Sequence, residues 1–99
     1  MYSNELICNI LNFLNQNINR NVSINELGNR FHYDKIYIMK LFKKIIGVCP
    51  KSYKKFMISK FSINDDDINL ICLNLSNLVI FIEQIKNYKN RLDLEECIK

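Results

Sequence analysis

The chain has 99 residues, of which 48% are hydrophobic, and this length suits one small domain with a modest core. One proline and two glycines leave little room for a turn-rich β fold. No apolar run reaches transmembrane length, and the N-terminus lacks the basic-then-apolar pattern of a signal peptide. We therefore expect a soluble, cytoplasmic protein.

The net charge of +4 is unevenly distributed along the sequence. Residues 20–60 hold ten basic and two acidic side chains, a balance of +8. From residue 61 to the end, four basic side chains stand against seven acidic ones, a balance of −3. A strongly basic segment is typical of a nucleic-acid-binding surface. The acidic C-terminal third does not fit that role.

Residue types that carry out catalysis or bind metals form no recognisable pattern. The sequence has no Gly-rich phosphate loop, no Ser/His/Asp or Cys/His arrangement and no paired catalytic carboxylates, so we expect neither an enzyme nor a cofactor. The only histidine, His32, is expected in a turn, and without a C-x-x-C pair a zinc site is not expected. The cysteines are expected to be reduced thiols, some of them buried: Cys8, Cys49, Cys72 and Cys97.

The first predicted helix covers residues 4–17 and begins after a cap at Ser3. A polar, Asn-rich connection is expected over residues 15–22. We expect the helix to pack across the two helices that follow. Its apolar residues recur at spacings of three and four, as on one buried face: Leu6, Ile7, Ile10, Leu11 and Leu14.

Two short helices are predicted next, over residues 24–30 and 35–46. Ser23 and Glu26 form a capping box for the first helix, and the small Gly28 inside it lets another helix cross closely. Asp34 caps the second helix, and Gly47 is well placed to end it. Two short helices joined by a tight turn, the second with a basic outer face, describe a helix-turn-helix.

The second helix of this pair has two different faces. Its apolar face contains Ile38, Leu41, Phe42 and Ile45. The opposite face is mostly basic and is expected to be exposed: Lys35, Met39, Lys40, Lys43 and Lys44.

This stretch resembles the DNA-binding domain of the AraC family of bacterial transcription regulators. Its most specific part is the run LFKKIIGV at residues 41–48. At His32 the family usually has glycine, but histidine tolerates positive φ better than most residues, so the turn is expected to survive. The matching residues are Ile24, Glu26, Leu27, Gly28, Phe31, Tyr33, Ile38, Leu41, Phe42, Lys43, Lys44, Gly47, Pro50 and Tyr53.

A further helix is predicted over residues 50–61, with Pro50 at its first position. Tyr53, Phe56 and Met57 lie along one side of it. The resemblance implies that it links two helix-turn-helix units. One departure is Ile58, where the family usually has arginine.

Residues 65–99 resemble the second unit only weakly. A helix capped by residues 64–67 carries Ile68, Ile71 and Cys72, with Leu75 at its end. Ser76 opens the next helix, which ends at Asn90, and a short helix capped by Asp93 follows over residues 94–98. The second turn lacks the family's Gly-aromatic pair, so this unit is interpreted as degenerate. The residues expected to point inward in its second helix are Leu78, Phe81, Ile82 and Ile85.

The resemblance implies that Ile36, Met39 and Lys40 face base edges in the major groove of DNA. Lys40 can donate to guanine O6 and N7, and Ile36 can cover a thymine methyl group. The alternative is an ordinary solvated basic face. Three further lysines of this helix would contact phosphates and so position the protein: Lys35, Lys43 and Lys44.

Two other groups of residues have alternative interpretations. Lys54 and Lys55, with Lys51, either reach a phosphate near a helix N-terminus or serve only solubility. In the second unit the corresponding reading positions include Glu83, which faces a polyanion unfavourably. We expect that face to pack internally, and the alternative is a protein contact. Its residues are Val79, Ile80, Glu83 and Gln84.

We therefore predict one all-α domain over residues 1–99 with six to seven short helices: a first helix-turn-helix unit (1–47), a linker helix (50–61) and a degenerate second unit (65–99). The function implied is sequence-specific binding of double-stranded DNA in transcription regulation. The alternative is a small protein-binding inhibitor or anti-activator of the mobile-element type that uses the C-terminal third. A homodimer or protein partner through that third is also considered, and neither membrane contact nor a small-molecule effector is expected.

Overall fold

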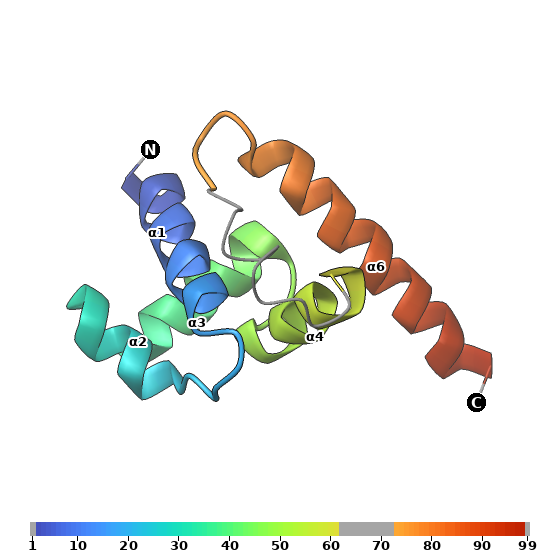
Figure 1. Cartoon of the computed structure of the whole chain (residues 1–99), viewed down its shortest axis with the longest axis horizontal. Coiled ribbons are helices and arrows are strands. Elements are labelled where there is room, and N and C mark those ends of the chain that lie inside the picture. The colour runs from blue at the N-terminus through green and yellow to red at the C-terminus, as the bar shows by residue number, and fades with distance from the viewer. Residues whose placement is uncertain (1, 62–72, 99) are drawn as a thin grey trace.

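The computed structural model of the chain describes residues 2–61 and 73–98, and all the regular structure in these two ranges is helical. α3 is central, because it contacts each of the other described helices (Figure 1). The predicted all-α class is confirmed, whereas the described part holds five helices instead of six to seven short ones. They are α1 (Tyr2–Gln16), α2 (Ile24–Phe31), α3 (Lys35–Ile46), α4 (Pro50–Phe61) and α6 (Leu78–Ile98).

The apolar stripe of α1 packs into the core and is buried as predicted, with Leu6 half-buried at its edge. The helix begins at Tyr2, so Ser3 lies inside it and is not its cap. Asn15 was expected in a polar connection, but it lies in α1 and is only 1% exposed. The reason is periodicity: Asn15 stands four residues after the buried Leu11 and therefore on the same face.

Aromatic side chains join α3, α4 and α6. Phe42 of α3 meets Tyr53 of α4 edge to face, and Tyr53 meets Phe81 of α6, each with ring centroids 6.0 Å apart. Phe56 of α4 makes the same kind of contact with Phe81 at 5.9 Å and with Tyr88 at 5.3 Å. Such pairs stabilise a core beyond their area burial, and here they hold α4 and α6 on the inner side of α3.

A buried polar pair connects α1 with α4. The Tyr53 hydroxyl donates a hydrogen bond of 2.5 Å to Asn15 Oδ1, and both side chains are almost fully buried. Burial raises the pKa of Tyr53 because the phenolate would lose its hydration, an effect only partly offset by the Asn15 bond. Asn15 Nδ2 has no hydrogen-bond partner among the described residues, which makes this pair costly as well as specific.

Asparagine side chains fix the start of α6. The Asn12 amide of α1 brackets Leu73, donating to its carbonyl and accepting from its N–H, both at 2.9 Å. Asn74 Oδ1 then accepts from the backbone of Ser76 and Asn77, and Asn77 Oδ1 accepts from Asn74 N–H. These caps place Ser76 in a turn, and the prediction that it opens the helix is wrong.

α6 is one continuous helix of 21 residues, whose C-terminal end extends past α4 in Figure 1. The predicted end at Asn90 and the separate helix over residues 94–98 are wrong. Nothing in the sequence of α6 breaks it, since it has neither glycine nor proline and asparagine costs an interior helical position little. Leu75, expected on a helix, lies exposed in the turn before α6.

The predicted helix with its cap at residues 64–67 lies mostly outside the described residues, as do Ile68, Ile71 and Cys72. The second helix-turn-helix unit is therefore not confirmed. By contrast, α3 and α4 have the bounds predicted for them, and Tyr53, Phe56 and Met57 of α4 are buried.

Candidate nucleic-acid interface

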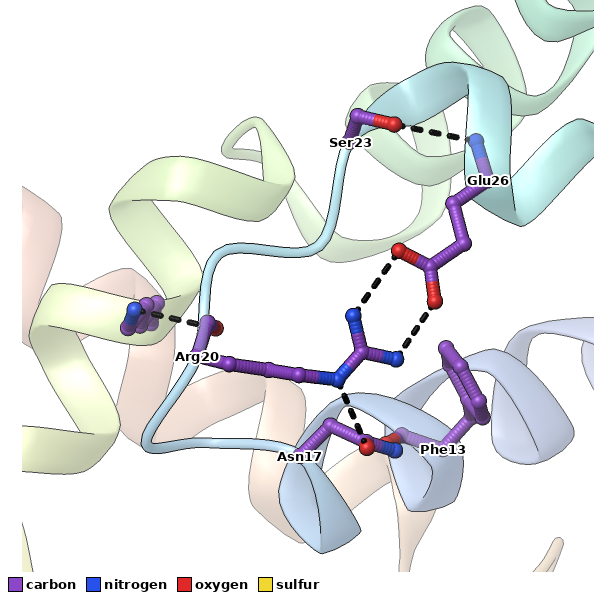
Figure 2. A network of polar contacts seen from close by, with 6 residues as sticks. Phe13, Asn17, Arg20, Ser23 and Glu26 are labelled. Carbon is purple, nitrogen blue, oxygen red and sulfur yellow. Dashed lines mark hydrogen bonds and ion pairs between the residues drawn. The ribbon is translucent and has the colours of Figure 1, made fainter.

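α2 begins with the backbone half of the predicted capping box. Ser23 Oγ accepts a hydrogen bond of 3.1 Å from Glu26 N–H, as expected of an N-cap. The Glu26 carboxylate turns instead to Arg20, whose Nη1 and Nη2 donate to its two oxygens at 2.9 and 2.5 Å (Figure 2). Arg20 Nε also donates to Asn17 Oδ1 at 3.0 Å, so the guanidinium ties the end of α1 to the start of α2.

This arrangement changes the charge of the surface. The hydrogen bonds from Arg20 lower the pKa of Glu26, and those bonds in turn raise the pKa of Arg20. Arg30 lies over the ring of Phe13, with 4.5 Å from the guanidinium carbon to the centroid, and Arg20 lies 5.9 Å from the same centroid. Both arginines of the basic segment thus contact Phe13 of α1.

A tight turn joins α2 to α3. His32 adopts the left-handed conformation, with φ 61° and ψ 41°, which confirms that histidine serves in this turn. The N–H of Tyr33 donates to the Gly28 carbonyl at 3.0 Å. A Cβ atom on Gly28 would lie 2.8 Å from the Tyr33 carbonyl oxygen and 3.4 Å from Lys35 N. The close approach at Gly28 therefore comes from the backbone of the turn and the first residue of α3.

α3 has a cap at each end where the sequence predicts one. Asp34 Oδ1 accepts a hydrogen bond of 2.8 Å from Ile36 N–H at the start of the helix. Gly47 ends it in the left-handed conformation, with φ 93°, and its N–H donates to the Lys43 carbonyl at 2.9 Å. Lys89 of α6 also reaches the Gly47 carbonyl, at 3.2 Å, which holds the C-terminal end of α3 against α6.

The two faces of α3 are separated as predicted. Ile38, Phe42 and Ile46 are buried, with Leu41 and Ile45 partly buried beside them. We call the opposite side the outer face of α3. It contains every predicted contact residue of this helix, all exposed, and one that was not predicted, Tyr37: Lys35, Ile36, Tyr37, Met39, Lys40, Lys43 and Lys44.

Aromatic and aliphatic side chains stand among these lysines. Ile36 is 56% exposed and Tyr37 is 44% exposed. The rings of Tyr37 and Tyr33 stack at 5.3 Å between centroids with 23° between planes. Neither tyrosine is among the contact residues predicted from the sequence. Their spacing of four residues could have indicated that the two rings lie side by side at the start of α3.

The lysines at the start of α4 differ from one another. Lys51 and Lys55 are exposed. Lys54 is half-buried, and its Nζ donates to the Arg20 carbonyl at 3.2 Å and to Asn21 Oδ1 at 3.1 Å. Lys54 therefore supports the loop before α2, and of the predicted pair Lys54 and Lys55 only the second extends freely from the surface.

A mostly apolar cavity of about 450 Å³ lies between the end of α1, the loop before α2, Met39 of α3 and the start of α4. Met39 lines this cavity besides lying at the edge of the outer face. Cys49 lines it too, directly before the first residue of α4, with Sγ 3.5 Å from Ser52 Oγ. Burial raises the pKa of the Cys49 thiol, but hydrogen bonds from Ser52 and nearby backbone groups lower it more, leaving it below its ordinary value.

The start of α6 exposes a second apolar surface. Val79 is 69% and Ile80 is 65% exposed, and Glu83 and Gln84 are exposed beside them. Gln84 accepts a hydrogen bond from Lys60 Nζ of α4. The expectation that this face packs internally is wrong. Leu78, Phe81 and Ile85 already fill the inner side of the helix, as predicted, with Ile82 half-buried.

Within residues 2–61 and 73–98, no three His, Cys, Asp or Glu side chains gather where they could hold a metal ion. None of the helices in these ranges has both the length and the apolar character needed to cross a bilayer. Comparison of the chain with models of protein families, with curated proteins and with solved structures gives no match.

Proposed function

We propose that the chain is a sequence-specific DNA-binding protein of transcription control that places the outer face of α3 in the major groove of double-stranded DNA. The observation that carries this proposal is the outer face itself. Four lysines are exposed on the 12-residue helix α3. A tight turn with His32 in the left-handed conformation joins this helix to α2. A helix in this setting is the element that helix-turn-helix proteins insert into the groove.

The dimensions and charges fit this use. Twelve residues give a helix of about 18 Å, and a major groove about 12 Å wide admits a helix. Lys35, Lys43 and Lys44 are assigned to phosphates, and Ile36 and Lys40 to base edges. Met39 is assigned to the edge of the surface that faces the bases, and Lys55 to a flanking phosphate. Lys54 binds the loop before α2 and is therefore not assigned to DNA.

The likeness of residues 23–53 to the AraC family supports a role in bacterial transcription control, and thus in the cytoplasm. Both the Gly28 approach and the His32 turn agree with that likeness at the level of backbone geometry. One reading helix covers a short site. The proposal therefore includes a second copy or a protein partner that lengthens the site.

The experiment is a selection of duplexes from a random pool with the purified full chain, followed by fluorescence anisotropy titration of the enriched sequence. The proposal requires an enriched motif whose affinity falls as salt rises. The matched control is the chain with Lys40→Ala, Lys43→Ala and Lys44→Ala, which should enrich nothing. An identical outcome for the wild-type chain and this control would remove α3 as the reading element.

A protein-binding inhibitor or anti-activator is the second candidate, and one observation favours it. Val79 and Ile80 stand exposed on α6 next to Glu83, a pattern that suits a protein surface better than a polyanion. The variant Val79→Ser/Ile80→Ser separates the two candidates. If α3 is the functional surface, this variant should bind DNA like the wild-type chain. If α6 is the functional surface, the variant should lose binding to its protein partner.

A further inference from the structure

The outer face of α3 has an unusual chemical composition for a helix that reads DNA. Its sequence, KIYIMKLFKKII, contains no Arg, Asn, Gln, Ser, Thr, Asp or Glu. Bidentate recognition of adenine uses Asn or Gln, recognition of guanine uses Arg or Lys, and recognition of cytosine uses Asp or Glu. On this helix hydrogen-bond readout of bases is therefore limited to lysines and one tyrosine.

The exposed apolar side chains gather in the first turn and a half of α3. Ile36 and Tyr37 are about half exposed, and Met39 is 38% exposed. Exposed side chains of this size cost little singly, but several together mark a contact surface. The N-terminal residues of a reading helix are those that approach base edges, so the apolar group stands where sequence is read, whereas Lys43 and Lys44 stand nearer the other end.

Two local features hold this group in place before any ligand binds. The stack of Tyr33 on Tyr37 fixes the Tyr37 ring. Asp34 Oδ1 accepts a hydrogen bond from the N–H of Ile36. A phosphate that approached the start of α3 would therefore meet a carboxylate instead of free backbone N–H groups. The capped N-terminus leaves phosphate contact at this end to the Lys35 side chain, whereas Ile36 and the stacked Tyr37 can meet apolar base edges.

We propose that Ile36 and Tyr37 read thymine C5-methyl groups, so that the DNA ligand is a short T-rich site whose sequence preference comes mainly from methyl contacts in the major groove. The inference rests on the proposed function and adds its substrate class. Thymine is the base that presents a methyl group there, and apolar side chains are its usual partners. Lys40 then adds at most a single guanine to the site.

The test replaces thymine by deoxyuridine, one position at a time, in the duplex that the selection enriches. This change removes the methyl group and leaves charge and hydrogen-bonding edges unchanged. Burial of one methyl-sized group corresponds to about a fourfold change in affinity. We expect losses of about that size at two or more positions, with an unchanged dependence on salt. Deoxyuridine outside the enriched motif should have no effect.

The variant Ile36→Ala connects the effect to the residue. It should bind the thymine duplex more weakly, and the thymine-to-deoxyuridine ratio should fall to about one at the position it contacts. Because Ile36 is exposed, circular dichroism should show that the helix content is unchanged. The matched control is Val79→Ala, an exposed apolar side chain on α6, which should leave the ratio as in the wild-type chain.

Equal affinity for thymine and deoxyuridine duplexes, with salt-dependent binding retained, would overturn the methyl inference and leave DNA binding intact. An enriched motif made of G·C pairs would do the same. Failure to bind any duplex would remove both the proposed function and this inference. A complex with a protein that Ile36→Ala disrupts, in the absence of DNA binding, would assign the apolar group to a protein surface instead.

Discussion

The carbonyl oxygen of Tyr33 lies over the α-carbon of Gly28, so closely that a Cβ atom on Gly28 would stand 2.8 Å from it. This contact lets the turn bring α3 against α2. Since the obstructing atom belongs to the backbone, it cannot move aside as a flexible side chain would. The orientation of the outer face of α3 therefore depends on a residue that has no side chain.

Gly28→Ala should destabilise the fold by about 1–3 kcal/mol through overpacking. This is the opposite of the usual effect, because alanine normally stabilises a helix interior relative to glycine by about 1 kcal/mol. Urea denaturation followed by circular dichroism measures the change. The control Asn29→Ala, at an exposed neighbouring position, should leave stability unchanged or slightly raised. Equal stability of Gly28→Ala and the wild-type chain would disprove the close approach.

Tyr53→Phe should cost about 1–3 kcal/mol, because the buried Asn15 Oδ1 would lose its hydrogen bond. The double variant Asn15→Leu/Tyr53→Phe should be less destabilised than the sum of the single variants. It removes the amide altogether, including Nδ2, which already lacks a partner among the described residues. A double-mutant cycle by urea denaturation provides the comparison, and simple additivity of the two changes would show that the pair is not coupled.

Glu26 should make the start of α2 sensitive to acid. The hydrogen bonds from Arg20 lower the pKa of Glu26 in the folded chain. The stabilisation of the fold by this ion pair is therefore complete at a pH above the pKa of Glu26 in the unfolded chain, and it is lost as the pH falls through the lower pKa of the folded chain. Thermal melting of the wild-type chain and of Glu26→Gln should therefore differ at neutral pH and converge in acid. The control is Glu83→Gln on α6. A gap that persists at low pH would exclude the carboxylate as its source.

Lys40 and Glu83 occupy matching positions on α3 and α6 in the proposed family register, and their variants should differ. Lys40→Ala should cost about 1–3 kcal/mol on the best site and relax the preference at one base pair. Glu83→Ala should leave DNA binding unchanged or slightly stronger, because it removes a negative charge near any phosphate. Titration on single-base variants of the site tests both. If Glu83→Ala weakens binding as much as Lys40→Ala, α6 also reads DNA.

The elements with local end signals could be predicted from the sequence. Asp34 caps the start of α3 with its side chain, and Gly47 ends the helix with its left-handed conformation. Pro50 starts α4, so the bounds of both helices follow from residues at their own ends. The start of α6 has a local signal as well, because Asn74 and Asn77 accept hydrogen bonds from each other's backbone N–H groups, but its position in the fold could not be predicted in this way. It depends on Asn12, whose amide binds Leu73 across 61 positions, and no local pattern shows that partner.

The same distinction applies to the candidate site. Helical periodicity places Met39, Lys40, Lys43 and Lys44 away from the buried face of α3. The prediction of Ile36 came from the family resemblance, and Lys35, three residues before the buried Ile38, lies exposed at the first position of the helix. Periodicity does not show that Lys54 turns inward to the loop before α2, or that Arg20 takes the Glu26 carboxylate from its expected capping role. These contacts depend on how the loop over residues 17–23 folds back. They reduce the basic surface to fewer residues than the charge count suggests.

The central claim is that lysines on the outer face of α3 contact DNA phosphates, and the dependence of affinity on salt tests it most directly. Anisotropy titrations between about 50 and 200 mM salt should give a linear log–log plot for the wild-type chain. For Lys43→Ala/Lys44→Ala the slope should be flatter by about 1.8, about 0.9 for each lost phosphate contact. Lys86→Ala, which removes an exposed charge from α6, should change it little. Equal slopes for the wild-type chain and the double variant, or an equal effect of Lys86→Ala, would contradict the assignment of α3 to the DNA.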